Sequence, residues 1–178
     1  DPWVKIEALN RGGGRLASRG LRVEAVKCFT KALDLLNDFD VENNHARAAL
    51  ENNLGHLFVS MEKWEDALSC FGRAVDFYEK GGDPVNAVRQ EANRGSVFRD
   101  MGRLYEALSC YEKALSVLRI YGSDAEIADQ HGNMAYIYAL SGNTEAARSH
   151  YWKARLLYGS AGQNARAALV DENLKILG

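Results

Sequence analysis

The chain has 178 residues, 47% of them hydrophobic, and a formal net charge of −2. This length normally corresponds to one domain or two, and the composition supplies a full hydrophobic core. A net charge this close to zero argues against nucleic-acid binding, because neutralising phosphates needs a basic face. No apolar run reaches the ~20 residues that a membrane helix requires. We therefore expect a protein that binds neither nucleic acid nor membrane.

Similar sequence blocks recur every 40 residues, and this period divides the chain into its predicted elements. Asn53-Leu54-Gly55 aligns with Asn93-Arg94-Gly95 and again with Asn133-Met134-Ala135. A fixed period of this size is typical of an array of stacked units. We expect a single domain over 1–178, with repeats at about 6–47, 48–87, 88–127 and 128–167 and a partial fifth repeat at 168–178.

The first predicted repeat, 6–47, departs furthest from the others. Gly12-Gly13-Gly14 falls inside its first helix, where each glycine costs about 0.5–1 kcal/mol relative to alanine. Arg11 stands where the later repeats carry asparagine. We expect this end of the protein to be frayed or distorted.

The second predicted repeat, 48–87, is a pair of helices separated by a short break at 60–63. Apolar residues recur at the steps of one helix face on both sides of that break: Leu50, Leu54, Leu57 and Phe58, then Trp64, Leu68, Phe71 and Val75. The repeat ends at two glycines followed by Asp83 and Pro84. Asp83 is predicted to cap the next helix and Pro84 to begin it.

The third and fourth predicted repeats follow the same plan of two helices, each of roughly 16 residues. Gly102 and Gly142 lie at their internal breaks, where glycine readily ends a helix. Ser123 and Glu126 have the spacing of a capping box. The partial fifth repeat supplies one terminal helix, and we expect it to expose four apolar residues: Leu169, Leu174, Ile176 and Leu177. No segment alternates with period two, so the predicted fold class is all-α.

Small residues recur where the two helices of each repeat must touch. They are Gly55, Gly95 and Ala135 in the first helices and Ala67, Ala107 and Ala147 in the second helices, with Ala74, Ala114 and Ala154 further on. An aromatic residue follows four positions after the first of these second-helix alanines: Phe71, Tyr111 and Tyr151. This pattern resembles the tetratricopeptide repeat (TPR), and repeat one fits it with Gly13, Ala25, Phe29 and Ala32.

The 40-residue length is similar to that of the Leu-Gly-Asn-repeat polarity adaptors and the kinesin light chains. The resemblance implies a right-handed superhelical solenoid of antiparallel helix pairs, with the first helices lining a concave groove. It also implies a scaffold or adaptor that holds an extended segment of another protein in that groove. Fold alone does not determine this function.

The resemblance places an asparagine of each repeat after the first on the groove side, namely Asn53, Asn93, Asn133 and Asn173. An asparagine amide both donates and accepts, so this ladder is predicted to bind the backbone of an extended peptide. The alternative is that these amides bond within a helix or bridge neighbouring repeats. Ala92, Gly132 and Ser96 leave room for a ligand backbone. The remaining predicted groove residues are Asn52, His56, Arg89, Arg99, Asp100, Asp129 and Tyr136.

Arg89 and Arg99 make the centre of the predicted groove mildly basic, which favours an acidic or phosphorylated partner segment. The alternative interpretation is two solvated arginines. The carboxylate clamp that some members of the family use for chaperone tails is not matched, because Asp129 would repel a carboxylate. We therefore expect no binding of free chaperone C-termini.

Catalytic and metal-binding patterns are not found in the sequence. Cys28, Cys70 and Cys110 occupy one repeat position, and ligands one repeat apart should lie roughly 10 Å from each other, too far to share an ion. They are interpreted as packing residues in a reducing, cytoplasmic setting. We expect no cofactor and no enzyme activity. Two other functions stay open: self-association through the chain's exposed ends, and a ligand-sensing regulator that changes pitch.

The chain begins at Asp1 without an initiator methionine or a signal-peptide pattern. We therefore expect it to be a fragment or a processed product.

Overall fold

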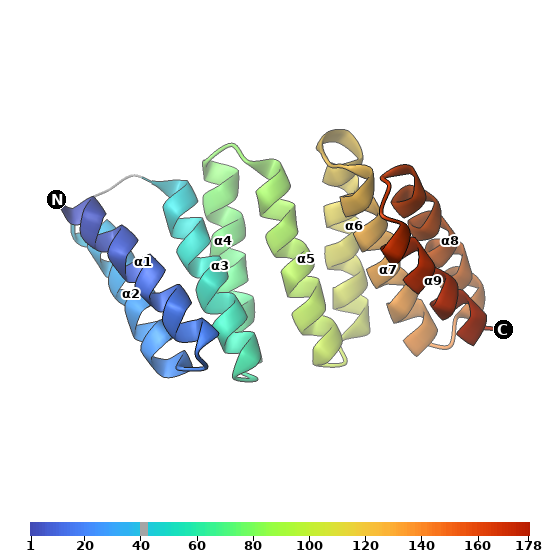
Figure 1. Cartoon of the computed structure of the whole chain (residues 1–178), viewed down its shortest axis with the longest axis horizontal. Coiled ribbons are helices and arrows are strands. Elements are labelled where there is room, and N and C mark those ends of the chain that lie inside the picture. The colour runs from blue at the N-terminus through green and yellow to red at the C-terminus, as the bar shows by residue number, and fades with distance from the viewer. Residues whose placement is uncertain (40–42) are drawn as a thin grey trace. The chain divides into compact units, whose positions relative to one another are not determined.

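The computed structural model describes residues 1–39 and 43–178 of the chain. Within these residues, all elements of secondary structure are α-helices joined by short turns (Figure 1). The helices are α1 (Pro2–Ser18), α2 (Arg22–Asp38), α3 (Asn44–Ser60), α4 (Trp64–Lys80), α5 (Pro84–Asp100), α6 (Leu104–Tyr121), α7 (Asp124–Leu140), α8 (Thr144–Ser160) and α9 (Asn164–Ile176). Most have 17 residues, close to the predicted 16. The all-α class is confirmed.

Side-chain caps start several of the helices at the residues that the sequence indicates. The Asn86 backbone N–H donates to Asp83 Oδ1 at 3.0 Å, directly before α5. Ser123 and Glu126 form the predicted capping box of α7. Such caps satisfy backbone N–H groups that have no partner inside a helix. The predictions of both helix starts are confirmed.

The turns inside the repeats use the left-handed backbone region. Gly102 and Gly142, predicted at two of these turns, both have φ of +76°. Glu62 takes the corresponding place between α3 and α4 with φ of +57°. A residue with a Cβ tolerates this conformation less readily than glycine, and the helical spacing had predicted a break here without identifying its geometry.

Contacts among the described residues divide the chain into two compact units, residues 1–90 and 91–178. Unit 1 contains α1 to α4, and its core joins side chains of α1, α2, α3 and α4, including Ile6, Phe29, Leu36, Leu50 and Cys70. Unit 2 contains α6 to α9 and the second half of α5. One of its core clusters is built from α7, α8 and α9, with Tyr151 and Tyr158 contributing the largest side chains.

Glycine in a first helix lets an aromatic ring of the following helix pack directly on the backbone. A Cβ on Gly13 would lie 2.7 Å from Phe29 Cε1, one on Gly55 would lie 2.6 Å from Phe71 Cε1, and one on Gly95 would lie 2.8 Å from Tyr111 Cε1. Each of these three rings is at most 2% exposed. These small residues therefore allow the two helices of a repeat to approach each other closely, as the sequence predicts.

The expectation of a frayed or distorted first repeat is wrong for its first helix. α1 runs without interruption through Gly12, Gly13 and Gly14. Gly13 is buried against Phe29, so the packing of that ring offsets the conformational cost of glycine in a helix. Pro2 in the first turn and the Asp1 side chain, which accepts from the Trp3 N–H at 2.9 Å, start the helix.

The terminal helix exposes fewer apolar side chains than expected. Leu169 is 59% exposed and Ile176 is 82% exposed. Leu174 of α9 and Leu177, the residue that follows the helix, instead pack against the core cluster of α7, α8 and α9. Among the described residues, no helix has the length and apolar character needed to cross a membrane.

Candidate functional site

Unit 2 contains a cavity of about 320 Å³ between α7 and α9, and α8 contributes tyrosines to it. Four predicted groove residues line it together: Asp129, Asn133, Tyr136 and Asn173. Gly132, predicted to leave room for a ligand, also lines it, and Tyr151 and Tyr158 of α8 are its aromatic members. The structure thus brings neighbouring repeats' predicted residues to one place.

The side-chain amides of Asn133 and Asn173 make no hydrogen bond to any other residue in the described part of the chain. Both residues are half-buried at the cavity. An asparagine amide in this position retains one donor group and one acceptor for a ligand. For these two asparagines, the described part of the chain therefore shows no side-chain hydrogen bond within a helix or between repeats.

Asp129 is held at one edge of the cavity by two donors. The Tyr158 hydroxyl donates to Asp129 Oδ1 at 2.5 Å, and Arg166 Nη1 donates to the same oxygen at 2.8 Å. Burial, followed by the hydrogen bond to Asp129, raises the pKa of Tyr158 above its usual value. Tyr158 therefore stays protonated and continues to donate at neutral pH.

Arg99 of α5 stands beside the same group of residues. Its guanidinium carbon lies 5.8 Å from the centre of the Tyr136 ring, within the range of a cation–π contact. Arg99 Nε also donates to Asp100 Oδ1 at 2.9 Å. An acidic partner would have to compete with Asp100 for this arginine. Arg89, the other predicted cation, donates from Nη1 to Asn86 Oδ1 at 2.7 Å.

Ser96 and Asn93 occupy the equivalent part of α5. The Ser96 hydroxyl lies 3.2 Å from the Tyr111 hydroxyl and also donates to the Ala92 carbonyl at 3.3 Å. Ser96 therefore positions the buried Tyr111 as well as leaving space. Asn93 is half-buried and already interacts within the chain.

Unit 1 places its predicted residues around a second cavity, of about 350 Å³, where Asn53 and His56 are among the lining residues. Asn53 Nδ2 donates to Asn10 Oδ1 of the preceding repeat at 3.2 Å. Bridging between repeats, the alternative interpretation, is thus realised for this asparagine. His56 packs edge-to-face on Phe71, with 5.2 Å between ring centres. Asn52 is half-buried and has its own partner.

A polar contact between the two helices of the repeats at 48–87 and 88–127 was not anticipated from the sequence. Glu51, buried in α3, accepts hydrogen bonds from Arg73 Nε at 2.7 Å and Arg73 Nη2 at 2.8 Å. Glu91 pairs with Lys113 and with Arg94 in the next repeat. The signal was available, since Glu51 and Glu91 share one repeat position and Arg73 and Lys113 another.

A buried, free cysteine lies beside each of these two glutamates: Cys70 beside Glu51 and Cys110 beside Glu91. Burial, followed by the charge of Glu51, raises the pKa of Cys70 to about 12, and burial with Glu91 does the same for Cys110. Thiols with such values are not nucleophiles at neutral pH. Cys28 is half-buried and also free. The interpretation of Cys70 and Cys110 as packing residues agrees with this placement.

In the repeat at 128–167, His131 stands at the position of Glu51 and Glu91, and it contacts His150, which stands at the position of Cys70 and Cys110. His131 Nδ1 lies 3.1 Å from His150 Nδ1, and the ring centres are 5.0 Å apart. His131 is 4% exposed. Burial, then the charges of His150, Lys153 and Arg119, lower the pKa of His131 to about 4. No group of three or more His, Cys, Asp or Glu side chains suited to a metal ion occurs among the residues described.

A family model described as "Tetratricopeptide repeat" matches residues 8–80 and 90–162, well over half of the chain. The chain belongs to the tetratricopeptide repeat family. Its members generally mediate interactions between proteins. This result confirms the resemblance drawn from the glycine, alanine and aromatic positions.

Solved structures share this TPR fold at low sequence identity. The apo form of RapI matches 99% of the chain at 15% identity with a TM-score of 0.90, and the chain spans about half (49%) of its length. BtubC (BKLC) from P. vanneervenii matches 99% at 14% identity, with 87% of its own length covered and a TM-score of 0.73.

A signal transduction ATPase with a tetratricopeptide repeat sensor, from Pyrococcus horikoshii, matches 96% of the chain at 18% identity with a TM-score of 0.86. Only 26% of that protein is covered. A search of curated proteins found no match. Identities this low establish a common fold and do not transfer a function.

Proposed function

We propose that this TPR protein is an interaction module whose first helices hold an extended segment of another protein. The observation that carries the proposal is the pair Asn133 and Asn173. Their amides meet at one cavity in unit 2 and make no hydrogen bond within the described chain. Each amide can bind a C=O and an N–H of a peptide backbone whatever its side chains are.

The rest of the cavity favours an extended ligand over a catalytic substrate. Gly132 leaves its part of the cavity lining open, because a Cβ on this residue would meet nothing within 4 Å. Tyr136, 47% exposed, offers an apolar ring with a polar tip, a combination common in protein-binding surfaces. Asp129 is immobilised by Tyr158 and Arg166 and supplies a fixed acceptor at the edge. We infer a scaffold or adaptor role, without cofactor or catalysis.

The test compares the wild type with an Asn133→Ala/Asn173→Ala double variant. Partners are captured from a cell extract, identified, and the binding segment is then titrated by calorimetry. At ~1 kcal/mol per net hydrogen bond, the variant should lose about 1–3 kcal/mol of binding free energy. Its melting temperature should stay that of the wild type.

Asn164→Ala is the matched control, because Asn164 is an exposed asparagine of α9 outside the cavity. It should bind like the wild type. An identified segment that binds the double variant with unchanged affinity would show that the asparagines do not hold the ligand, and the proposal would then be abandoned.

A further inference from the structure

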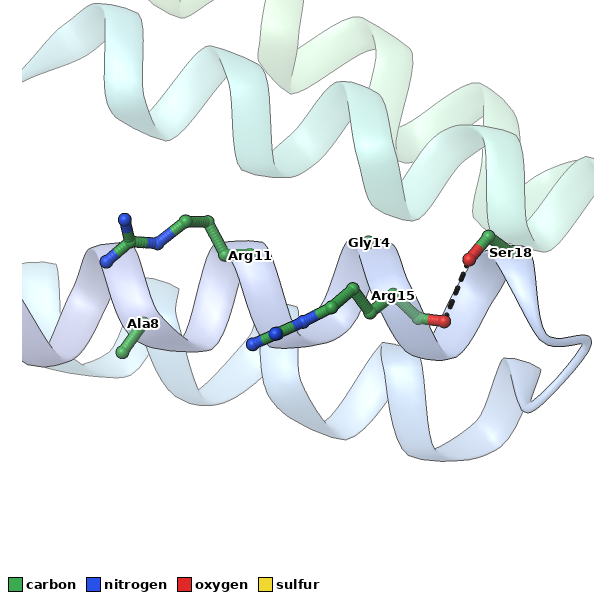
Figure 2. Close-up of a pocket in the computed structure, with 5 residues that line it drawn as sticks. All are labelled: Ala8, Arg11, Gly14, Arg15 and Ser18. Carbon is green, nitrogen blue, oxygen red and sulfur yellow. Dashed lines mark hydrogen bonds between the residues drawn. The ribbon is translucent and has the colours of Figure 1, made fainter.

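Unit 1 has two adjoining cavities on its first helices, which we call the α1 cleft. One, of about 580 Å³, is lined by Ala8, Arg11, Gly14, Arg15 and Ser18 of α1 (Figure 2). The other, of about 350 Å³, is the one that contains Asn53 and His56, and Gly14 and Arg22 also line it. Gly14 lines both cavities, so they are neighbours at that residue.

Gly14 is the reason that the α1 cleft is open. A Cβ on Gly14 would meet nothing within 4 Å. The corresponding position of the later repeats carries a side chain, namely His56, Ser96 and Tyr136. The triple glycine therefore has two uses: Gly13 admits the Phe29 ring on one side of α1, and Gly14 leaves the other side hollow.

Within the described part of the chain, the charged side chains that line the α1 cleft are all cationic. Arg11, Arg15 and Arg22 are exposed, and none of them forms an ion pair with any residue that the structure describes. Figure 2 shows the first two extending along α1 toward its N-terminal end. Other arginines of the chain do have a carboxylate partner: Arg73, Arg94, Arg99, Arg103, Arg155 and Arg166.

The charge around the α1 cleft differs in sign from that of the whole chain. Residues 1–31 contain seven lysines and arginines and three acidic residues, whereas the chain has a net charge of −2. A concave surface lined by one sign of charge concentrates the field at its opening. Among the residues that the structure describes, no carboxylate lines either cavity of the cleft. The unit 2 cavity contrasts with it, because Asp129 lines that one.

We propose that the α1 cleft binds an acidic peptide segment, one with clustered aspartate or glutamate side chains, of the partner protein. This inference rests on the proposed function and adds the chemical class of the ligand. Guanidinium groups bind carboxylates through paired N–H donors. Asn53 Oδ1, which accepts no hydrogen bond within the described chain, can receive a backbone N–H of the segment. The sequence had assigned acidic binding to Arg89 and Arg99, whose nitrogens are engaged by Asn86 and Asp100.

The probe is a synthetic eight-residue peptide of alternating glutamate and glycine, titrated into the isotopically labelled full chain and followed by NMR. We expect amide shifts centred on α1 around Gly14, and binding that weakens as salt rises. The same peptide with glutamine or lysine in place of glutamate should cause no such shifts. Shifts centred elsewhere, or none, would overturn the proposal.

Variants of the α1 cleft distinguish the contribution of its charge to peptide affinity from that of its shape. Arg11→Gln/Arg15→Gln should weaken binding about tenfold or more, the loss expected for one charge-assisted hydrogen bond. Arg19→Gln removes an exposed arginine of the same region that does not line the cleft and should change affinity little. Gly14→Trp should block the cleft, whereas Gly14→Ala has room for its methyl group and should keep binding. Equal affinity for all four variants would contradict the proposal.

The last experiment titrates the chain with a single-stranded DNA oligonucleotide that carries the same charge as the peptide. Binding of the oligonucleotide that equals or exceeds that of the peptide would mean a general polyanion surface and would overturn the peptide assignment. The captured partner distinguishes the two proposals. A partner that is lost in Asn133→Ala/Asn173→Ala but retained in Arg11→Gln/Arg15→Gln leaves the interaction function standing and refutes the acidic ligand.

Discussion

At the scale of single residues, the packing of aromatic rings on glycine determines which glycines can be replaced by a larger residue. Gly55 and Gly12 are both glycines inside helices, and helix propensity alone treats them alike. Their surroundings differ, since Phe71 covers Gly55 and nothing lies within 4 Å of a Cβ on Gly12. Phe71 is 1% exposed, and a Cβ on Gly55 would lie 2.6 Å from its Cε1 atom. The same substitution should therefore have opposite effects at the two positions.

Gly55→Ala should lower the free energy of unfolding by about 1–3 kcal/mol, because the added methyl group overpacks the core against Phe71. Gly12→Ala should raise it by up to about 1 kcal/mol through helix propensity. Urea denaturation of the two variants and the wild type measures both effects. Equal changes of the same sign would mean that the ring contact does not constrain the helix.

At the scale of paired helices, a polar contact joins the two helices in each of the three repeats from 48 to 167. The contact is an ion pair of Glu51 with Arg73 in one repeat and of Glu91 with Lys113 in the next. In the repeat at 128–167 it consists of two titratable rings, with 3.1 Å between the Nδ1 atoms of His131 and His150. Lys153 of α8 and Arg119 of α6 are the cations that oppose protonation of His131. Protonating both rings would place like charges in a buried contact, which is costly.

Stability of unit 2 should therefore decrease in acid. The pKa of folded His131 is about 4, below the ordinary value of 6.5, so the unfolded chain binds more protons between these values. The stabilisation is fully present above pH 6.5 and is lost as the pH falls toward about 4. We expect the urea midpoint to be lower at pH 5 than at pH 7.

The control for this pH effect is His131→Gln/His150→Gln, which cannot titrate at these positions. The difference between its midpoints at pH 5 and pH 7 should be smaller than that of the wild type. A difference of the same size in both proteins would assign the acid sensitivity to other groups.

At the scale of the whole molecule, the second function considered is self-association through the terminal helix. Of the four apolar residues expected there, only Leu169 and Ile176 are exposed within the described chain. Stable interfaces bury about 1,200 Å² or more in total, which two side chains do not supply. We expect a mass of 19.7 kDa, that of one chain, by light scattering at low micromolar concentration. A mass that doubles with concentration, and no longer does so in Ile176→Ser, would support self-association instead.

The repeat period and the small-residue pattern were sufficient to predict the helices, their turns and the family. The reason is that these features are local: a cap, a glycine turn and an apolar face each act within a few residues of the chain. The phase of the asparagines predicted a ladder on the first helices, and two of its members, Asn133 and Asn173, line one cavity. The period and the phase could not predict which side chains already have hydrogen-bond or ion-pair partners within the protein.

Those partners depend on the tertiary structure, because they come from residues distant in sequence. Asn53 meets Asn10 from the preceding repeat, and Glu51 meets Arg73 across a helix pair. Gly14 opens a cleft only because nothing from a neighbouring element fills the space above it. The sequence by itself determined the helical repeats and the family. Only the tertiary structure decided which amides and guanidinium groups remain available to a ligand, since hydrogen bonding and ion pairing depend on distance in space.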